Sequence, residues 1–389
     1  MSAPTTATRK YKVALLIETS REYARGLLRG IALWNQKHGA FACEFQPYGL
    51  SELPTNWLKN WNGDGVLVRI DNKEMEEVVL ASGLPAIDLR SSQPNPRVLV
   101  MGVDNVAIAH MAFEHLHDAG FVHYAFCGTR RHINVYDDQR REYFRELVEE
   151  AGLTCDDFPA ERVSQRGKVR DNELHAIAKW LKTLPIPTAV MACKDDRGIQ
   201  VLEAARLIGR KIPDELAILS VDNDPFFCNL ADPSLTSIDT NSDHIGYEAA
   251  AQLYRMMQGE TCHHRTILFP PREVVKRRST DVLAISNRKE AEILGYLREM
   301  ALAGLTVRDV AEHFDISISH LERLSKKYFN RTPKEEMFRV QIEEAKKLLK
   351  RTRLSLNHVA VQSGFRSVSY FMTTFKRVTG YSAMGWRGE

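Results

Sequence analysis

The apolar positions of the larger, N-terminal part of the chain form short runs, and amphipathic stretches of helical spacing separate many of them. In the first such helix, predicted over residues 20–38, Tyr23, Leu27, Ile31 and Trp34 fall on one stripe. The runs predict strands at residues 13–17, 65–68, 86–89, 98–100, 124–127, 189–192 and 217–221. Strands that alternate with helices are typical of parallel sheets with helical crossovers, hence of a doubly wound α/β fold. Because residues 11–284 are more than a domain with one open sheet usually contains, we expect two lobes with a cleft between them.

The C-terminal part contains a helix-turn-helix pattern between Ser355 and Gly380. Ser355 can cap a first helix, Gly364 supplies the left-handed residue that leaves it, and Ser367 can cap a second helix. The inward positions are Leu356, Val359 and Ala360 on the first helix and Tyr370, Phe371 and Phe375 on the second. An ordinary helical hairpin has the same pattern, so this stretch alone leaves both interpretations open.

A second copy of the pattern lies about fifty residues upstream. Thr306 and Ser317 can cap its two helices, and the buried positions of the second helix include Leu321 and Leu324. The duplication favours a DNA-binding domain over an ordinary hairpin.

One long helix is predicted between the two copies. Thr332, Pro333 and Glu335 form a capping box with proline at the first helical position, and the helix runs to about Arg351. Its roughly nineteen residues, at about 1.5 Å each, span nearly 28 Å. This is close to one duplex turn of about 34 Å, so two recognition helices can enter successive major grooves on one side of DNA.

The outward positions of the second helix of each copy are the candidate DNA-binding residues. They are Ser319, Glu322, Arg323 and Lys326 in the first copy and Val368, Ser369, Met372, Thr373 and Lys376, with Arg377, in the second. Polar and small side chains near the start of a helix can contact base edges, and cationic side chains one turn later can contact phosphates.

Residues 289–387 resemble the DNA-binding domain of the AraC family of bacterial transcription regulators, most specifically in the stretch GFRSVSYFMTTFKRVTGYSAMGWR. By position, the residues that match the base-contacting faces of that family are Ser319, Glu322, Arg323, Val368, Ser369, Met372 and Thr373. One departure affects the last turn, where Ala383 and Met384 follow a serine that usually precedes proline.

The charge is divided unevenly along the chain. After residue 285 there are 19 Lys and Arg against 12 Asp and Glu, whereas the remainder has 34 against 38. A basic module on a mildly acidic body fits a chain in which one part binds phosphates, although a solvated basic surface has the same composition.

The six cysteines form no C-x-x-C pair, and the N-terminal residues MSAPTTATRKYK contain no apolar signal segment. No apolar run approaches membrane-spanning length. These features predict a soluble, cytoplasmic protein with reduced thiols. Histidine and cysteine lack the spacing of a structural zinc site, and the motifs of common catalytic sites are absent. We therefore expect that the protein binds no metal and no cofactor and is not an enzyme.

In doubly wound folds, ligands bind at the carboxyl ends of the strands, so the residues that follow each run are candidates for an effector site. The candidates that we select at these positions are Glu18, Arg69, Asp88, Asp195 and Asp222. Carboxylates and arginines around a cleft can accept from and donate to the vicinal hydroxyls of a sugar. The alternative is that many of these residues only cap helices or form surface ion pairs.

Residues 11–281 resemble the periplasmic-binding-protein-like effector domain of the LacI/GalR repressors. The stretches that carry this are RREYFRELVEEAGL, MACKDDRGIQVLEAARLIGRKIPDELAILSVDNDP, SLTSIDTNSDHIGYEAAAQLYRMMQGE and FPPREVVKRRST. By position, Arg140 matches the arginine that holds the effector in that family, Asp195 the residue after the next strand, and Asp222 the acidic effector contact. The chain departs from both families, because LacI/GalR repressors carry an N-terminal DNA-binding headpiece and most AraC regulators carry a cupin barrel as sensor.

The two resemblances together predict a short N-terminal tail (1–10), an effector domain (11–284), a linker (285–289) and a double helix-turn-helix domain (290–389). The combination resembles the regulators of bacterial pentose operons. It implies a homodimeric activator that binds double-stranded DNA and a small sugar, D-xylose before other sugars, and that recruits RNA polymerase. Two alternatives stay open, a DNA-repair methyl acceptor with an AraC-type domain and a cytoplasmic sugar-binding module whose tail binds protein.

Overall fold

The computed structural model describes residues 9–45, 58, 61–90, 97–160, 169–262, 265–282, 285 and 287–388. The chain divides into two compact units. The first comprises residues 1–116 and 122–282, and the second comprises residues 117–121 and 283–389.

The first unit is built on two six-stranded sheets, ordered β11-β5-β4-β3-β1-β2 and β12-β10-β9-β8-β6-β7. Their strands are β1 (Tyr11–Leu16), β2 (Phe41–Phe45), β3 (Gly65–Val68), β4 (Ala86–Asp88), β5 (Leu99–Val103), β6 (His123–Cys127), β7 (Thr154–Asp157), β8 (Thr188–Ala192), β9 (Leu216–Val221), β10 (Thr236–Asp239), β11 (Thr266–Phe269) and β12 (Glu273–Val275). Neighbouring strands are parallel except for the pair of β10 and β12. The α/β fold with two parallel-stranded lobes is therefore confirmed.

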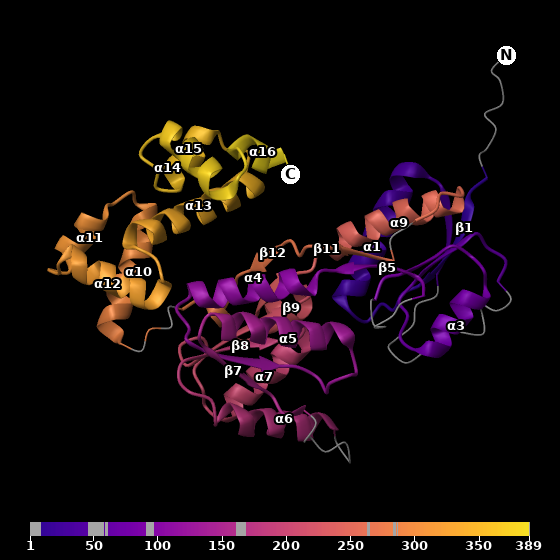
Figure 1. The fold of residues 1–389 in the computed structure, drawn as a ribbon, viewed down its shortest axis with the longest axis horizontal. Coiled ribbons are helices and arrows are strands. Elements are labelled where there is room, and N and C mark those ends of the chain that lie inside the picture. The colour runs from indigo at the N-terminus through magenta and orange to yellow at the C-terminus, as the bar shows by residue number, and fades with distance from the viewer. Residues whose placement is uncertain are drawn as a thin grey trace. The chain divides into compact units, whose positions relative to one another are not determined.

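Helices cover both sheets (Figure 1). They are α1 (Glu22–His38), α3 (Lys73–Ala81), α4 (Asn105–Asp118), α5 (Val135–Glu150), α6 (Val169–Leu181), α7 (Asp195–Leu207), α8 (Pro225–Leu230) and α9 (Ser242–Met257). The chain passes between the two sheets three times, after β5, after β10 and after β11. These crossings hold the lobes together and place the carboxyl ends of their strands around a shared opening.

The strands that the apolar runs predict are all present, with ends that differ by at most a few residues. The pattern misses β2, β7, β10, β11 and β12. Only one residue of β2 is buried, and β7 and β11 have exposed positions along their length. The edge strands β2, β7, β11 and β12 bury too few side chains to produce an apolar run. β10 is buried at three positions, but two of them are the polar residues Thr236 and Ser237.

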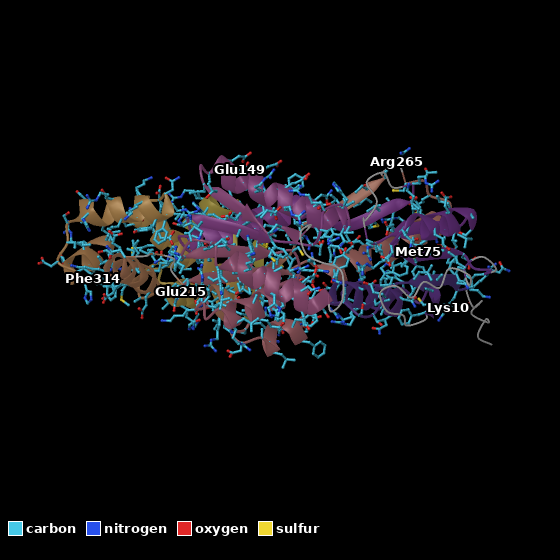
Figure 2. All side chains as sticks on the ribbon, turned by 90° about the horizontal axis from the view of Figure 1, so that it is seen from below. Lys10, Met75, Glu149, Glu215, Arg265 and Phe314 are labelled. Carbon is cyan, nitrogen blue, oxygen red and sulfur yellow. The ribbon has the colours of Figure 1, made fainter. Side chains whose placement is uncertain are left out.

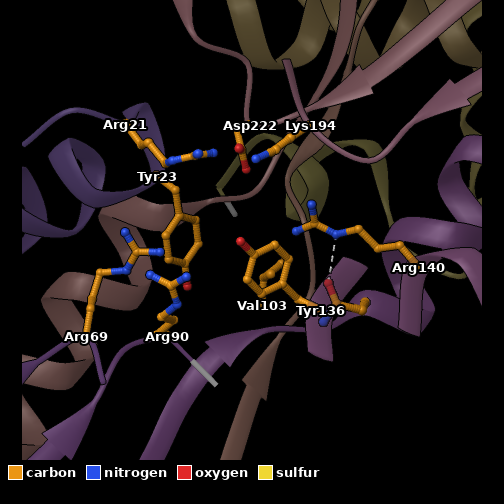
Figure 3. Close-up of a pocket in the computed structure, with 10 residues that line it drawn as sticks. Arg21, Tyr23, Arg69, Arg90, Val103, Tyr136, Arg140, Lys194 and Asp222 are labelled. Carbon is orange, nitrogen blue, oxygen red and sulfur yellow. Dashed lines mark hydrogen bonds between the residues drawn. The ribbon is translucent and has the colours of Figure 1, made fainter. Parts of the chain in front are cut away.

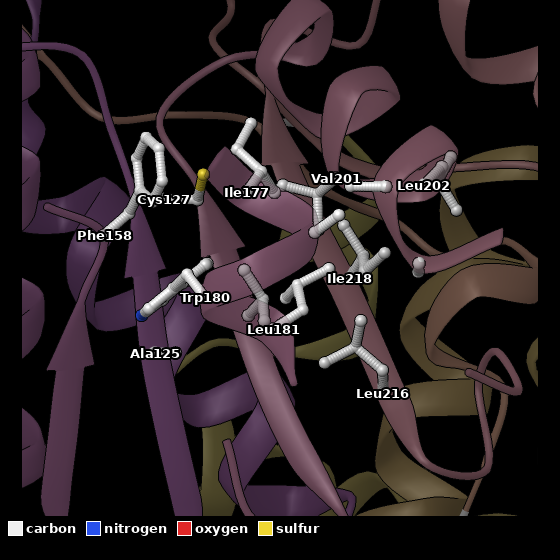
Figure 4. Packing of buried hydrophobic residues seen from close by; sticks show 14 of the residues in the cluster. Ala125, Cys127, Phe158, Ile177, Trp180, Leu181, Val201, Leu202, Leu216 and Ile218 are labelled. Atoms are coloured by element: carbon white, nitrogen blue, oxygen red, sulfur yellow. The ribbon is translucent and has the colours of Figure 1, made fainter. Parts of the chain in front are cut away.

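The core of the second lobe packs α6 and α7 against the central strands (Figure 4). Trp180 of α6 lies against Phe158, with ring centroids 5.4 Å apart. Val201 of α7 and Ile218 of β9 are fully buried in the same cluster. Charged side chains such as Glu149 and Arg265 lie outside these cores, at the surface (Figure 2).

The second unit is helical. It contains α10 (Arg288–Leu302), α11 (Val307–His313), α12 (Ile318–Phe329), α13 (Pro333–Arg351), α14 (Leu356–Gln362), α15 (Val368–Thr379) and α16 (Ala383–Gly388). The predicted capping box at Thr332 and Glu335 opens α13, which runs between the two helix-turn-helix motifs (Figure 1). The motifs have separate apolar cores, one around Leu321 and Leu324 and one around Phe371 and Phe375.

Two details of the second unit bear on the expected arrangement. Ile285, which the sequence analysis assigns to the linker, belongs to the core of the first motif. Helical spacing predicts that Tyr370 points inward, but it is 48% exposed because its ring contacts Phe338 and Phe365 only at the edge of the core. None of the helices in the described part of the chain is both long and apolar enough to cross a membrane.

Candidate effector pocket and nucleic-acid interface

A cavity lies between the two lobes of the first unit. Its lining comes from the strand ends and adjoining helices of both lobes (Figure 3). The lining residues are Arg21, Tyr23, Arg69, Arg90, Val103, Asn105, Tyr136, Arg140, Lys194 and Asp222. A lining that combines aromatic rings with a few charged and polar groups can bind a small polar ligand.

Arg140, which the sequence selects, is a fixed donor at this cavity. Its Nε donates to Asn105 Oδ1 at 2.9 Å and its Nη1 donates to the Cys193 carbonyl at 2.7 Å. Its guanidinium lies 5.4 Å from the ring centroid of Tyr136. Within the described residues Nη2 forms no hydrogen bond, so it keeps its N–H donors for a ligand.

Asp222 is the carboxylate of the cavity, and no described residue donates a hydrogen bond to its side chain. Its backbone lies in the left-handed region, with φ at 109°, a conformation that persists where the surroundings or a function require it. Figure 3 shows Asp222 with Arg21 and Lys194 pointing toward it. A carboxylate that has acceptor capacity left over suits the hydroxyl donors of a sugar.

The charge on Asp222 is costly. Burial raises its pKa, and Asp196 adds to this, whereas Arg140, Arg21 and Lys194 lower it. Burial also raises the pKa of Asp195, with the charge on Asp222 as the next cause. The two carboxyl groups therefore disfavour each other's ionisation.

Arg69 lines the cavity, and Glu18 lies behind it in a buried ion pair. The guanidinium of Arg69 also lies 5.3 Å from the ring centroid of Tyr23. Glu18 therefore holds the arginine and is not itself part of the lining.

Asp88 and Asp195, two further candidates from the sequence, support the loops around the cavity but do not line it. Asp88 Oδ1 accepts from the backbone N–H groups of Ile70 and Arg90, at 3.0 and 2.9 Å. Asp195 accepts from the hydroxyls of Ser220 and Ser237 and from the backbone N–H of Asp224. The structure thus brings Arg69, Arg140 and Asp222 together at the cavity and places the other three candidates one layer behind.

The remaining lining residues are not among the candidates from the sequence. Arg21, Arg90 and Lys194 also follow strands, and each is anchored by a carboxylate, Asp71 for Arg90 and Asp196 for the other two. Position after a strand could have found them. Tyr23 falls on the apolar stripe of its helix, and Tyr136 lies on α5, where periodicity gives no sign of a pocket.

The candidate DNA-binding residues of the second unit lie on the two predicted helices. Ser317 and Ser367 cap α12 and α15, accepting from the backbone N–H groups of His320 and Tyr370. On α12 and α15 the exposed candidates are Ser319, Glu322, Arg323, Lys326, Ser369, Met372, Thr373 and Lys376. Val368 is half-buried and packs on the core of the second motif, whereas the exposed candidates remain accessible to a ligand.

Comparison with known proteins gives two family models. Residues 113–280 match a periplasmic binding protein-like domain, and residues 310–389 match a helix-turn-helix domain.

Similar proteins span nearly the whole chain. A xylose operon regulatory protein of Haemophilus influenzae is 28% identical over 377 residues, which cover 94% of this chain and 95% of that protein. The protein of the same name from Escherichia coli strain K12 is 28% identical over 380 residues, 95% of each chain. A solved structure described as the xylose-binding transcription activator xylR covers 98% of both chains with a TM-score of 0.64 and 26% identity. These relatives are transcription regulators and not enzymes.

Proposed function

Because the chain belongs with the xylose operon regulators, DNA-binding proteins in which a periplasmic-binding-protein-like sugar sensor precedes an AraC-type domain, we propose that it is a D-xylose-dependent transcription activator. The observation that carries the proposal is the cavity between the lobes, where the Asp222 carboxylate and the fixed guanidinium of Arg140 line the same space. An acceptor and a donor held apart in this way suit neighbouring hydroxyls of one sugar ring.

The proposed mechanism couples the sugar to DNA through the arrangement of the lobes. A sugar that contacts Arg69 from one lobe and Asp222 from the other binds the closed arrangement more tightly than an open one. That difference in affinity is the free energy available to change DNA binding by the C-terminal domain. We place the effector domain at residues 11–284, the linker at 285–289 and the DNA-binding domain at 290–389.

Three parts of the proposal rest on the family alone. The regulator acts as a homodimer on paired half-sites, it recruits RNA polymerase from sites beside a promoter, and it works in the cytoplasm. Its contacts with DNA are assigned to the exposed residues of α12 and α15.

The methyl-acceptor alternative needs a cysteine that is readily ionised. Burial instead raises the pKa of five of the six thiols, those of Cys43, Cys127, Cys155, Cys193 and Cys228, and it raises the pKa of Cys127 to about 12. These five thiols are poor nucleophiles, which argues against the methyl-acceptor alternative.

Thermal unfolding of the purified chain with a panel of pentoses and hexoses tests the sensor. A ligand that binds only the native state raises the melting temperature, and at a fixed concentration a tighter ligand raises it more. D-xylose should raise it, and Asp222→Ala should abolish the rise. A rise with other sugars and none with D-xylose would overturn the assignment of the effector.

Gel-shift titration at several salt concentrations tests the other half. The full chain should bind duplex DNA more tightly with D-xylose than without it, and binding should weaken as salt increases. A chain that binds the sugar but shows no salt-dependent DNA binding would instead be a sugar-binding module with a protein-binding tail.

A further inference from the structure

The exposed surface of α12 is charged near its start. Glu322 and Arg323 are adjacent and exposed, and Lys326 follows one turn later. The Arg323 Nη2 group and His320 Nδ1 lie 2.9 Å apart in a hydrogen bond. Within the described residues the Arg323 guanidinium forms no other hydrogen bond or ion pair, so it retains donors for a ligand. Paired donors of this kind match guanine O6 and N7, and a neighbouring carboxylate matches the cytosine amino group.

The exposed surface of α15 is different. From Val368 to Thr373 it carries no charged or amide side chain, and its first cations are Lys376 and Arg377 in the last turn. Met372 is 43% exposed. Thr373 Oγ1 donates to the Ser369 carbonyl at 3.0 Å, so the hydroxyl proton is used within the helix. The groups that remain for a ligand near the helix start are the Thr373 methyl, the Met372 thioether and the single hydroxyls of Ser369 and Tyr370.

From this contrast we infer that the two helices contact different base pairs, α12 a G·C pair and α15 the methyl groups of thymines. The inference rests on the proposed placement of both helices in major grooves. Thymine alone among the four bases presents a methyl group there. The exposed residues from Val368 to Thr373 include no side chain that makes a bidentate contact with a base, so apolar contact with this methyl group is the specific contact that they offer. Because α13 separates the motifs, the G·C and thymine subsites should lie about one helical turn, roughly 10 base pairs, apart.

His320 is a positioning residue for this contact. Its backbone N–H donates to the Ser317 hydroxyl at 3.1 Å, which fixes the residue at the start of α12. Its ring nitrogen then accepts from Arg323, which limits the directions available to the guanidinium. Selectivity for guanine should therefore depend on His320 although it contacts no base itself.

The first experiment tests the thymine contacts. Duplexes selected by the full chain from a random library, with D-xylose present, are resynthesised with deoxyuridine in place of thymidine, which removes only the methyl. In the α15 subsite, replacing a thymine whose methyl group is contacted should weaken binding about threefold, which corresponds to the free energy of burying one methyl group. The same replacement in the α12 subsite should change nothing.

Two variants of Thr373 form a matched pair for this measurement. Thr373→Val keeps the methyl and loses the hydroxyl, so it should bind like the wild type. Thr373→Ser keeps the hydroxyl and loses the methyl, so it should lose about threefold and become insensitive to deoxyuridine at the contacted position. The reverse result, with serine tolerated and valine not, would assign the contact to the hydroxyl and overturn the inference for α15.

The second experiment tests the guanine contact. Replacing the selected guanine with 7-deazaguanine removes N7, and it should weaken wild-type binding about tenfold but leave Arg323→Ala unaffected. His320→Ala should lower the preference for guanine, and His320→Gln, which offers an acceptor in its place, should restore it. Equal losses on every duplex for Arg323→Ala would assign this residue to a phosphate and overturn the inference for α12. If no sequence is enriched and binding is independent of salt, the proposed function itself fails.

Discussion

At the scale of single residues, the pocket works against the stability of the fold. The Asp222 carboxylate accepts no hydrogen bond from a described residue, and burial raises its pKa above the ordinary value for aspartate. The ionised form is therefore less favourable in the folded chain than in the unfolded chain. Such a group lowers the stability of the unliganded fold, but it gives the binding site a hydrogen-bond acceptor for a ligand.

We predict that Asp222→Asn stabilises the unliganded protein while it abolishes the response to sugar. Because burial raises the pKa of Asp222 from 3.8 to about 6, the ionised carboxylate is destabilising, and the gain should reach up to about 3 kcal/mol at pH 8. As the pH falls toward 5 the wild-type carboxyl takes up its proton, so the gain should shrink. Denaturant unfolding of both proteins from pH 5 to 8 measures it, with exposed Asp232→Asn as the control. A gain that grows toward low pH would contradict the assignment.

The sequence indicates where this pocket lies but does not show which candidate residues line it. Position after a strand identifies Arg69, Asp88 and Asp195 alike, because it fixes only the edge of the sheet on which they lie. Which side chain then faces the cavity depends on the loop. Asp88 turns back to accept from two backbone N–H groups, whereas Arg69 extends into the opening.

At the scale of elements, a buried ion pair joins α10 to α13. The Glu336 side chain is fully buried, and it accepts from Arg298 and from Arg339 at 2.7 Å each. Burial lowers the pKa of Arg298 to about 10, and Glu336 opposes this. Such a pair adds little compared with apolar packing, but removing one partner leaves the other charge buried without compensation.

Glu336→Gln should therefore destabilise the helical unit by about 3 kcal/mol. Glu344→Gln, on the same helix and in a more exposed pair with Lys347, should cost at most about 0.5 kcal/mol. Denaturant unfolding followed by circular dichroism compares the two. Similar small effects for both substitutions would show that water reaches the pair at Glu336.

Gly364 fixes the turn between α14 and α15. It has φ at +79°, and a Cβ at this position would lie 2.1 Å from the Ala301 carbonyl oxygen of α10. Gln341 spans the same contact, donating to the carbonyls of Ala301 and Gly364 at 2.8 and 3.0 Å. The second helix-turn-helix is thus held on α10 and α13 through backbone groups at this glycine.

Gly364→Ala should cost about 3 kcal/mol and weaken DNA binding at the α15 subsite, because strain and overpacking add. Gly380 is the matched control, since it has φ at +78° and a Cβ there would have no described atom within 4 Å. Gly380→Ala should lower the free energy of unfolding by only about 1 kcal/mol, because alanine is unfavourable in the left-handed backbone conformation. Equal melting temperatures for the two variants would show that α10 moves aside at no cost.

Helices of the second unit could be predicted closely because their ends depend on local chemistry. The cap at Thr306, the capping box at Thr332 and the left-handed Gly364 are all where the sequence places them. Strands such as β2 and β12 could not be predicted, since their pairing depends on distant strands and their side chains form no apolar run.

At the scale of the whole molecule, the sequence carries enough to assign both units. The apolar runs separated by helices specify the α/β body, and the repeated caps specify the double helix-turn-helix. The angle between the units and the coupling between their ligands are collective properties, so no local pattern in the sequence encodes them.

The coupling between sugar binding and DNA binding leads to a prediction that involves both binding sites. If the sugar raises DNA affinity by some factor, DNA must raise sugar affinity by the same factor, typically about 5- to 150-fold. Calorimetric titration of the sugar with and without operator DNA, and of DNA with and without sugar, should give equal factors. A flexible Gly/Ser insertion of about six residues between residues 284 and 285, where the effector domain meets the linker, should lower both factors together, because slack at this junction lets either ligand bind without constraining the other unit. The separate affinities for sugar and for DNA should survive the insertion. A variant that keeps the full factor would exclude this linker as the route of the coupling.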